Sequence, residues 1–227
     1  MPRPTDPVLR PRQGRYLERL LPERDALRRE MGAAAAAEGI PIAHPQLGRL
    51  LEALAAIRPD GRLLEVGTAI GYGTLHLARG AHAGRVISID EDAGRLARAR
   101  GYLERAGVAA RVELVHGSAL AVIERLEPFF DLVFLDADKT GYRRQLDAVV
   151  PKLVVGGRLV IDNLLWKGRI ADPSLRPEGD RDAAAIEAFN PYLTIHPQLA
   201  SVLLPLGDGV GLAVKRRVTL RELGGPY

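Results

Sequence analysis

The most constraining feature of the sequence is the segment 63–74, which reads LLEVGTAIGYGT. A short apolar run ends in an acidic residue, three glycines follow within a few positions, and an amphipathic segment then begins. This order predicts a strand, a tight turn and the start of a helix. Glycines let the backbone turn through conformations closed to other residues, and free N–H groups at a helix N-terminus bind polar ligands. We therefore expect an α/β domain that holds a nucleotide-like ligand at this turn.

The spacing of the glycines indicates which ligand is held. They stand at Gly67, Gly71 and Gly73, whereas a dinucleotide-binding turn has glycines at its first, third and sixth positions. The sixth position counted from Gly71 is His76, which disfavours a dehydrogenase. The pattern Glu-x-Gly-x-x-x-Gly-x-Gly instead resembles the S-adenosylmethionine (SAM) turn of Rossmann-like methyltransferases. A glycine-rich turn without a ligand is the competing interpretation.

The length of 227 residues, 47% of them hydrophobic, suits one sizeable core and is short for two full domains. We expect an N-terminal arm over residues 1–14, a single domain over 15–217 and a C-terminal tail over 218–227. No apolar run is long enough to span a membrane and no apolar signal segment opens the chain, so we expect a cytoplasmic protein without a membrane partner. The absence of cysteine excludes disulfides, thiolate zinc sites and cysteine nucleophiles.

The net charge of +4 permits an anionic partner such as RNA or an acyl-CoA. A well-solvated, arginine-rich surface explains the same charge without any partner. Charge alone therefore does not choose between these interpretations.

Apolar runs alternate with amphipathic segments along most of the chain, which predicts a parallel sheet covered by helices. Accessory helices are expected between 14 and 38, followed by helices near 45–57, 72–79, 92–106, 141–150 and 181–190. Strands are expected near 62–66, 85–90, 111–115, 131–135, 157–163, 199–205 and 210–216. The turn at 207–209 joins the last two strands as a hairpin. The predicted fold is a Rossmann-like α/β domain with a seven-stranded, mostly parallel sheet, an antiparallel terminal hairpin and helices on both faces.

Polar residues follow several of the predicted strands, at the edge where such sheets bind ligands. Asp90 ends the second strand, where a carboxylate is placed to accept the ribose hydroxyls of an adenosine ligand. Ser118 follows the third strand, and either contact with the adenine or an N-cap role suits it equally.

Asp136 follows the fourth strand, and Asp162 with Asn163 follows the fifth. Their oxygen atoms could converge on one hard divalent cation, for which Mg²⁺ is favoured and Mn²⁺ or Ca²⁺ are alternatives. A carboxylate at a strand end can also cap the next helix, so no single one of these residues decides the matter. The irregular segment 164–180, which contains Trp166, is long enough to suggest a function.

From about Tyr16 to Arg216 the chain resembles the cation-dependent O-methyltransferases that include catechol and caffeoyl-CoA O-methyltransferases and their bacterial relatives. Four motifs in order carry the resemblance: LEVGTAIGY at 64–72, LDADK at 135–139, IDNLLWKG at 161–168 and GDGV at 207–210. The resemblance implies a homodimer and a hydroxylated aromatic substrate.

The resemblance also implies roles for individual residues. The metal ligands would be Asp136, Asp162 and Asn163, and Lys139 would be the general base. SAM would be surrounded by Ala43, Glu65, Gly67, Thr68, Gly71, Gly73, Asp90, Ser118, Asp136 and Asp138. Trp166 and Asp208 would contact the substrate. The chemistry is consistent, because a dication stabilises a phenolate and a nearby amine can take its proton. A solvated lysine at a helix start is the competing interpretation of Lys139.

Two positions depart from the family pattern. Gly73 stands where many relatives carry serine, so a hydroxyl contact to the SAM carboxylate is in doubt. The segment 186–190, IEAFN, differs from the usual Arg-Glu-Phe-Asn, which puts contacts at the substrate edge or dimer interface in doubt.

Two acceptors remain open on the sequence. One is a small catechol-like or phenolic compound, and the other is a 5-hydroxyuridine of tRNA, which the basic charge permits. A SAM- or RNA-binding module without catalysis is disfavoured, because Lys139 and the full set of metal ligands are present.

Overall fold

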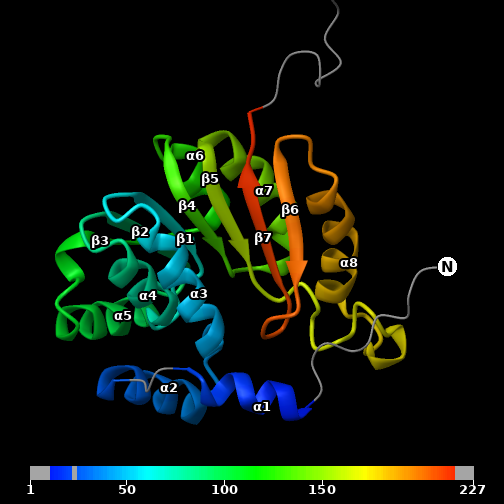
Figure 1. The fold of residues 1–227 in the computed structure, drawn as a ribbon, viewed down its shortest axis with the longest axis horizontal. Helices are drawn as coiled ribbons and strands as arrows, with labels where there is room; N and C mark the ends of the chain where they lie inside the picture. The colour runs from blue at the N-terminus through cyan, green and yellow to red at the C-terminus, as the bar shows by residue number, and fades with distance from the viewer. Residues whose placement is uncertain (1–10, 22–24, 218–227) are drawn as a thin grey trace, which may run out of the picture.

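The computed structural model describes residues 11–21 and 25–217. Its centre is a seven-stranded sheet with the order β3-β2-β1-β4-β5-β7-β6 (Figure 1). The strands are β1 (Arg62–Val66), β2 (Arg85–Asp90), β3 (Val112–His116), β4 (Phe130–Leu135), β5 (Leu153–Ile161), β6 (Leu199–Leu204) and β7 (Val210–Lys215). The first five strands are mutually parallel, and β7 runs antiparallel to both β5 and β6. The predicted fold class is confirmed.

The described helices are α1 (Pro11–Arg19), α2 (Ala26–Glu38), α3 (Pro45–Ala56), α4 (Tyr72–Gly80), α5 (Ala93–Arg105), α6 (Ala119–Arg125), α7 (Tyr142–Val149) and α8 (Arg181–Thr194). They form one core with each face of the sheet. Helices α6, α7 and α8 bury side chains in one core, and α2 to α5 bury theirs in the other. None of the described helices is long and apolar enough to cross a membrane.

Strand β1 shows how the sequence directs side chains to the two cores. Successive side chains of a strand point to opposite faces, so Leu64 and Val66 join the core of α6 to α8 while Leu63 joins the other core. Glu65 therefore shares the face of Leu63, beneath α4. Strands covered by helices on both faces are usually apolar along their whole length. Glu65 is a charged-type residue buried in such a strand, which suggests a role in the site.

Several element boundaries differ from the predictions. Strand β5 begins at Leu153, four residues before the predicted start at residue 157, because Leu153 pairs with Phe130 of β4. The register of the two strands shifts after this pair, next to the glycines at 156 and 157. Helix α8 runs through Pro191 to Thr194, beyond the predicted end near residue 190, although proline removes one helical hydrogen bond. Helix α6 was not predicted. Its short length gives little periodicity from which to predict it.

Helix α1 begins at Pro11, so residues 11–14 of the predicted arm are helical. The rest of that arm, 1–10, and the predicted tail, 218–227, lie outside the described residues. Helices α1 and α2 lie at the end of the molecule toward which β5 points (Figure 1). Ion pairs from Arg79 to Asp25, from Arg98 to Glu38 and from Arg105 to Glu30 hold α2 against α4 and α5.

Candidate active site

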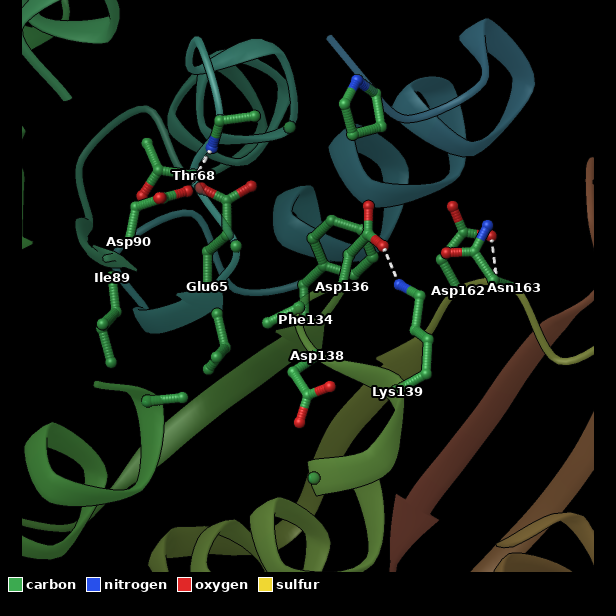
Figure 2. Close-up of a pocket in the computed structure, with 18 of the residues that line it drawn as sticks. Glu65, Thr68, Ile89, Asp90, Phe134, Asp136, Asp138, Lys139, Asp162 and Asn163 are labelled. Atoms are coloured by element: carbon green, nitrogen blue, oxygen red, sulfur yellow. Dashed lines mark hydrogen bonds and ion pairs between the residues drawn. The ribbon is translucent and has the colours of Figure 1, made fainter. Parts of the chain in front are cut away.

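A cavity of about 760 Å³ lies along the carboxyl ends of the parallel strands. This is within the usual range for a small-molecule site. Of the residues predicted from the sequence to form the site, all but Gly71 line the cavity. Figure 2 shows how the ends of β1, β2, β4 and β5 bring their side chains to this edge.

The glycine turn lets two loops approach closely. Gly67 has a φ of +103°, and a Cβ atom there would lie 2.1 Å from the carbonyl oxygen of Asp136. Gly71 has a φ of +86° and precedes α4, with a Cβ position 3.0 Å from the Cβ of Ala99 in α5. Gly71 therefore allows the left-handed turn before α4 and the close packing of α4 against α5. Its backbone faces α5, so it does not line the cavity.

Glu65 is fully buried beneath the turn. Its Oε2 accepts hydrogen bonds from Ser88 Oγ at 2.5 Å and from the Thr74 hydroxyl, and the pairing of Glu65 with Ser88 in the β1-β2 register places these groups together. Its Oε1 has no hydrogen-bond partner. Burial raises the pKa of Glu65 to about 8. The carboxyl group is therefore protonated at neutral pH and keeps a buried oxygen free for a ligand.

Gly73 lies against this glutamate. A Cβ atom at residue 73 would lie 2.3 Å from Glu65 Oε1 and 3.3 Å from Phe134 Cε1. The departure from serine at this position thus leaves room for the Glu65 side chain.

Asp90 is held at the end of β2 by two backbone amides. Its Oδ2 accepts from Ala69 N at 2.8 Å, and its Oδ1 accepts from Asp92 N at 2.9 Å. These bonds fix the carboxylate beside the glycine turn, as its predicted role requires. Ser118 is the N-cap residue of α6, as the capping alternative expects, but its side chain makes no cap hydrogen bond.

Asp136 and Asp162 meet because β4 and β5 are neighbours, with Leu135 paired to Ile161. Asp162 is only 6% exposed. Burial, followed by the charge of Asp136, raises the pKa of Asp162 to about 7, and burial raises the pKa of Asp136 as well. No ion pair within the described part of the chain reaches Asp162. A buried carboxylate and a partly buried one that repel each other are a suitable pair of ligands for a cation.

Asn163 completes the predicted metal set and has a left-handed backbone, with a φ of +64°. Within residues 11–21 and 25–217, no group of three His, Cys, Asp or Glu side chains forms a metal cluster. The predicted set has two carboxylates and one amide, so it differs from such a cluster in composition.

Lys139 points toward Asp136 (Figure 2), with its Nζ 2.7 Å from Asp136 Oδ1. It also donates to the hydroxyl of Tyr142 at 2.9 Å, and that hydroxyl donates to the carbonyl oxygen of Asp162 at 3.0 Å. Lys139 is therefore not a solvated lysine. Tyr142 was missed in the sequence analysis, although its position three residues after Lys139 at a helix start was the available signal.

Two further predicted residues are engaged with the chain itself. Asp138 points away from the pair of Asp136 and Lys139 (Figure 2), and its carboxylate accepts from Thr140. Asp208, in the turn between β6 and β7, accepts from Lys167 N at 2.5 Å and lies 3.5 Å from Asn163 Nδ2. Asp208 therefore fixes the segment after β5 at the end of the cavity.

Comparison with known proteins identifies the family. Residues 25–216 match the model of a family described as O-methyltransferase. This chain belongs to that family. A catechol O-methyltransferase of Mycobacterium tuberculosis is 37% identical over 84% of this chain and 89% of its own length.

Solved structures of other O-methyltransferases share the fold. A Bacillus cereus O-methyltransferase in complex with SAH has a TM-score of 0.78 at 28% identity, covering 89% of this chain and 96% of its own. A Streptomyces achromogenes O-methyltransferase involved in tomaymycin synthesis, in complex with SAM, has a TM-score of 0.77 at 27% identity, covering 89% and 95%. The predicted family is confirmed.

Proposed function

We propose that this O-methyltransferase transfers a methyl group from SAM to a hydroxyl of a small catechol-type or phenolic substrate, and that a divalent cation assists. The observation that carries the proposal is one cavity lined by both the glycine turn and the carboxylate pair with Lys139, in which Thr68 and Asp90 lie on one side and Asp162 and Asn163 on the other (Figure 2). One end suits the methyl donor and the other suits the acceptor.

SAM as the donor is supported by features of the turn. The unpartnered, buried Oε1 of Glu65 offers a hydrogen-bonding group to a ligand, and the Asp90 carboxylate is fixed where it can meet ribose hydroxyls. The relatives from Bacillus cereus and Streptomyces achromogenes, crystallised with SAH and SAM, support the same donor.

Asp136, Asp162 and Asn163 would hold the cation. Their chemistry fits a hard dication, since oxygen ligands from buried carboxylates with raised pKa values are stabilised by positive charge. When bound, the cation would act as a Lewis acid that lowers the pKa of a substrate hydroxyl.

As a neutral amine, Lys139 would accept the proton of that hydroxyl. Asp136 and Tyr142 hold its amine at the end of β4, so the base is positioned before the substrate arrives. The remaining acceleration would come from alignment of the acceptor oxygen with the methyl group in a cavity that excludes much of the solvent.

A catechol-type acceptor is supported by the cavity size and by the catechol O-methyltransferase relative. Hydroxyuridine in tRNA is supported by a resemblance to some bacterial relatives in the motifs GIPI at 39–42, HP at 44–45 and GTAIGY at 67–72, and the basic charge permits it. It is an alternative outcome of the test below. Mg²⁺ as the cation is part of the same proposal and is supported by the oxygen ligands that the strand ends offer. A homodimer, which the resemblance implies, and a cytoplasmic location are also part of it.

The test is methyl transfer from labelled SAM by the purified protein, with Mg²⁺ and either a catechol panel or hydroxyuridine-containing tRNA. We expect transfer to catechols that a chelator abolishes and added Mg²⁺ restores. Asp162→Ala should lose transfer but keep SAH binding in calorimetry, whereas the control Asp172→Ala, at an exposed turn, should keep both. Transfer to tRNA alone, or full activity of Asp162→Ala, would contradict the proposal.

A further inference from the structure

The segment after β5 has an unusual backbone. Asn163, Trp166 and Lys167 have φ values of +64°, +47° and +56°. Residues with side chains seldom adopt this region, and such conformations persist only where the surroundings hold them. The contacts of this segment therefore show what fixes its shape.

Asp208 and Asp180 supply those contacts from two different elements. Asp208 holds Lys167, as described above. Asp180 precedes α8, and both of its carboxylate oxygens lie 3.3 Å from the indole Nε1 of Trp166. The segment is thus fixed from the β6-β7 turn on one side and from the start of α8 on the other.

The Asp180 carboxylate is the meeting point of several groups. It accepts from Ala183 N at 3.0 Å, which caps α8, and pairs with Arg169 Nη1 at 2.9 Å. Its side chain is only 10% exposed. The backbone hydrogen bond from Ala183 lowers the pKa of Asp180, followed by the bonds from Trp166 and Arg169, so the group is ionised at neutral pH.

Trp166 lines the cavity beside Asn163 and Asp208, whereas Asp180 does not. An aromatic wall at this end would pack against the ring of a phenolic acceptor. The Trp166 side chain also packs against the core of α6 to α8, and the hydrogen bond from its N–H fixes the orientation of the ring within that contact.

We propose that Asp180 is a positioning residue that fixes the Trp166 indole as the wall of the acceptor end, and thereby sets the affinity for the aromatic substrate. This inference rests on the proposed function for its substrate, but the coupling of Asp180 to Trp166 is measurable without any substrate.

Two substitutions separate this role from helix capping. Asp180→Ser keeps a good N-cap residue for α8, but the shorter side chain does not reach the indole. Asp180→Asn keeps both the cap and an acceptor for the indole N–H. Asp172→Ser is the matched control, because Asp172 caps a short turn in the same segment through Ser174 and does not contact Trp166.

The single tryptophan of the chain provides a direct readout. In Asp180→Ser we expect a red-shifted emission and greater quenching by acrylamide than in the wild-type protein. We expect Asp180→Asn and Asp172→Ser to resemble the wild type. With a catechol substrate, Asp180→Ser should raise KM by about tenfold with a smaller change in kcat and in SAH affinity, which is the signature of lost ground-state binding.

Unchanged emission and quenching in Asp180→Ser would overturn the proposal. A shifted emission with an unchanged KM in the same variant would also overturn it. An equal loss in Asp172→Ser would also overturn it, because a general loosening of the segment would then explain the effect. If the wild type methylates no phenol, the proposed function fails, while the fluorescence comparison still decides whether Asp180 holds Trp166.

Discussion

Lys139 Nζ lies 2.7 Å from Asp136 Oδ1, which joins the predicted base to a predicted metal ligand. The turn between β4 and α7 creates this contact, because it brings residues three apart onto the same side. The ion pair holds the Lys139 amine at the wall of the cavity, where only 12% of the lysine side chain is exposed. A change at either residue therefore alters the position of the other.

Replacing the base should affect chemistry more than binding. Lys139→Met keeps the length of the side chain but removes the amine, so we expect kcat to fall by about 10²–10⁴-fold. SAH affinity, measured by calorimetry, should change little because the donor turn is at the other end of the cavity. Lys152→Met is the control, since Lys152 binds the Leu126 carbonyl away from the cavity and should remain active. Wild-type turnover by Lys139→Met would refute the assignment.

Tyr142 links the base to the strand that carries Asp162. Tyr142→Phe removes a buried hydroxyl that bonds Lys139 and the Asp162 carbonyl. We expect the free energy of unfolding to fall by about 1–3 kcal/mol, because buried polar groups lose their partner. Urea denaturation would measure this. In the control Tyr192→Phe, whose hydroxyl bonds Asp147 at an exposed site, the loss should stay within about 0.5 kcal/mol.

The sequence predicted the fold because its strands are apolar runs of regular length and its turns carry glycine. Prediction was weaker where a local rule was overridden by tertiary contacts. Pro191 continues α8 because Leu193 beyond it is buried in the core, and β5 extends back past a glycine pair because Leu153 pairs with β4. Neither pairing is visible in the local sequence.

Some residues of the site were predicted from the sequence and others were not. The acids at the strand ends could be placed, because parallel strands bring their carboxyl ends to one edge. Asp180 could not, since its role depends on which indole lies next to it in the fold. For Tyr142 the sequence offered only its spacing from Lys139, and its bond to the Asp162 carbonyl is visible only in the fold. The space for the Glu65 carboxyl group beside Gly73 is likewise a property of the packed structure.

Gly73→Ser should weaken the donor end of the site in this chain. The new Cβ would clash with Glu65 Oε1, so Glu65 would have to leave its bonds to Ser88 and Thr74. We expect SAH affinity to fall by about tenfold, the equivalent of about 1.4 kcal/mol, in a calorimetric titration.

Gly101→Ala is the control for a helix glycine. No atom lies within 4 Å of a Cβ at residue 101, so this change should leave SAH binding intact and stabilise α5 by about 0.5–1 kcal/mol. SAH binding by Gly73→Ser that equals the wild type would show that Glu65 can move without cost.

Glu65 should make stability depend on pH. Burial raises its pKa from 4.5 to about 8, so the folded protein binds this proton more tightly than the unfolded chain does. The stabilisation is complete below the unfolded pKa and is lost as the pH rises through the folded pKa. Between these values Glu65 should lower the free energy of unfolding by at most about 5 kcal/mol.

Glu65→Gln isolates this contribution, because the amide stays neutral at every pH. Urea unfolding of the SAH-free protein should show the wild type losing stability relative to Glu65→Gln between pH of about 5 and about 9. The difference between the two proteins removes the titration of all other groups, provided that they act independently. Parallel pH profiles for the two proteins would mean that the buried carboxyl group is solvated or paired in solution, and that it does not hold an oxygen free for the ligand.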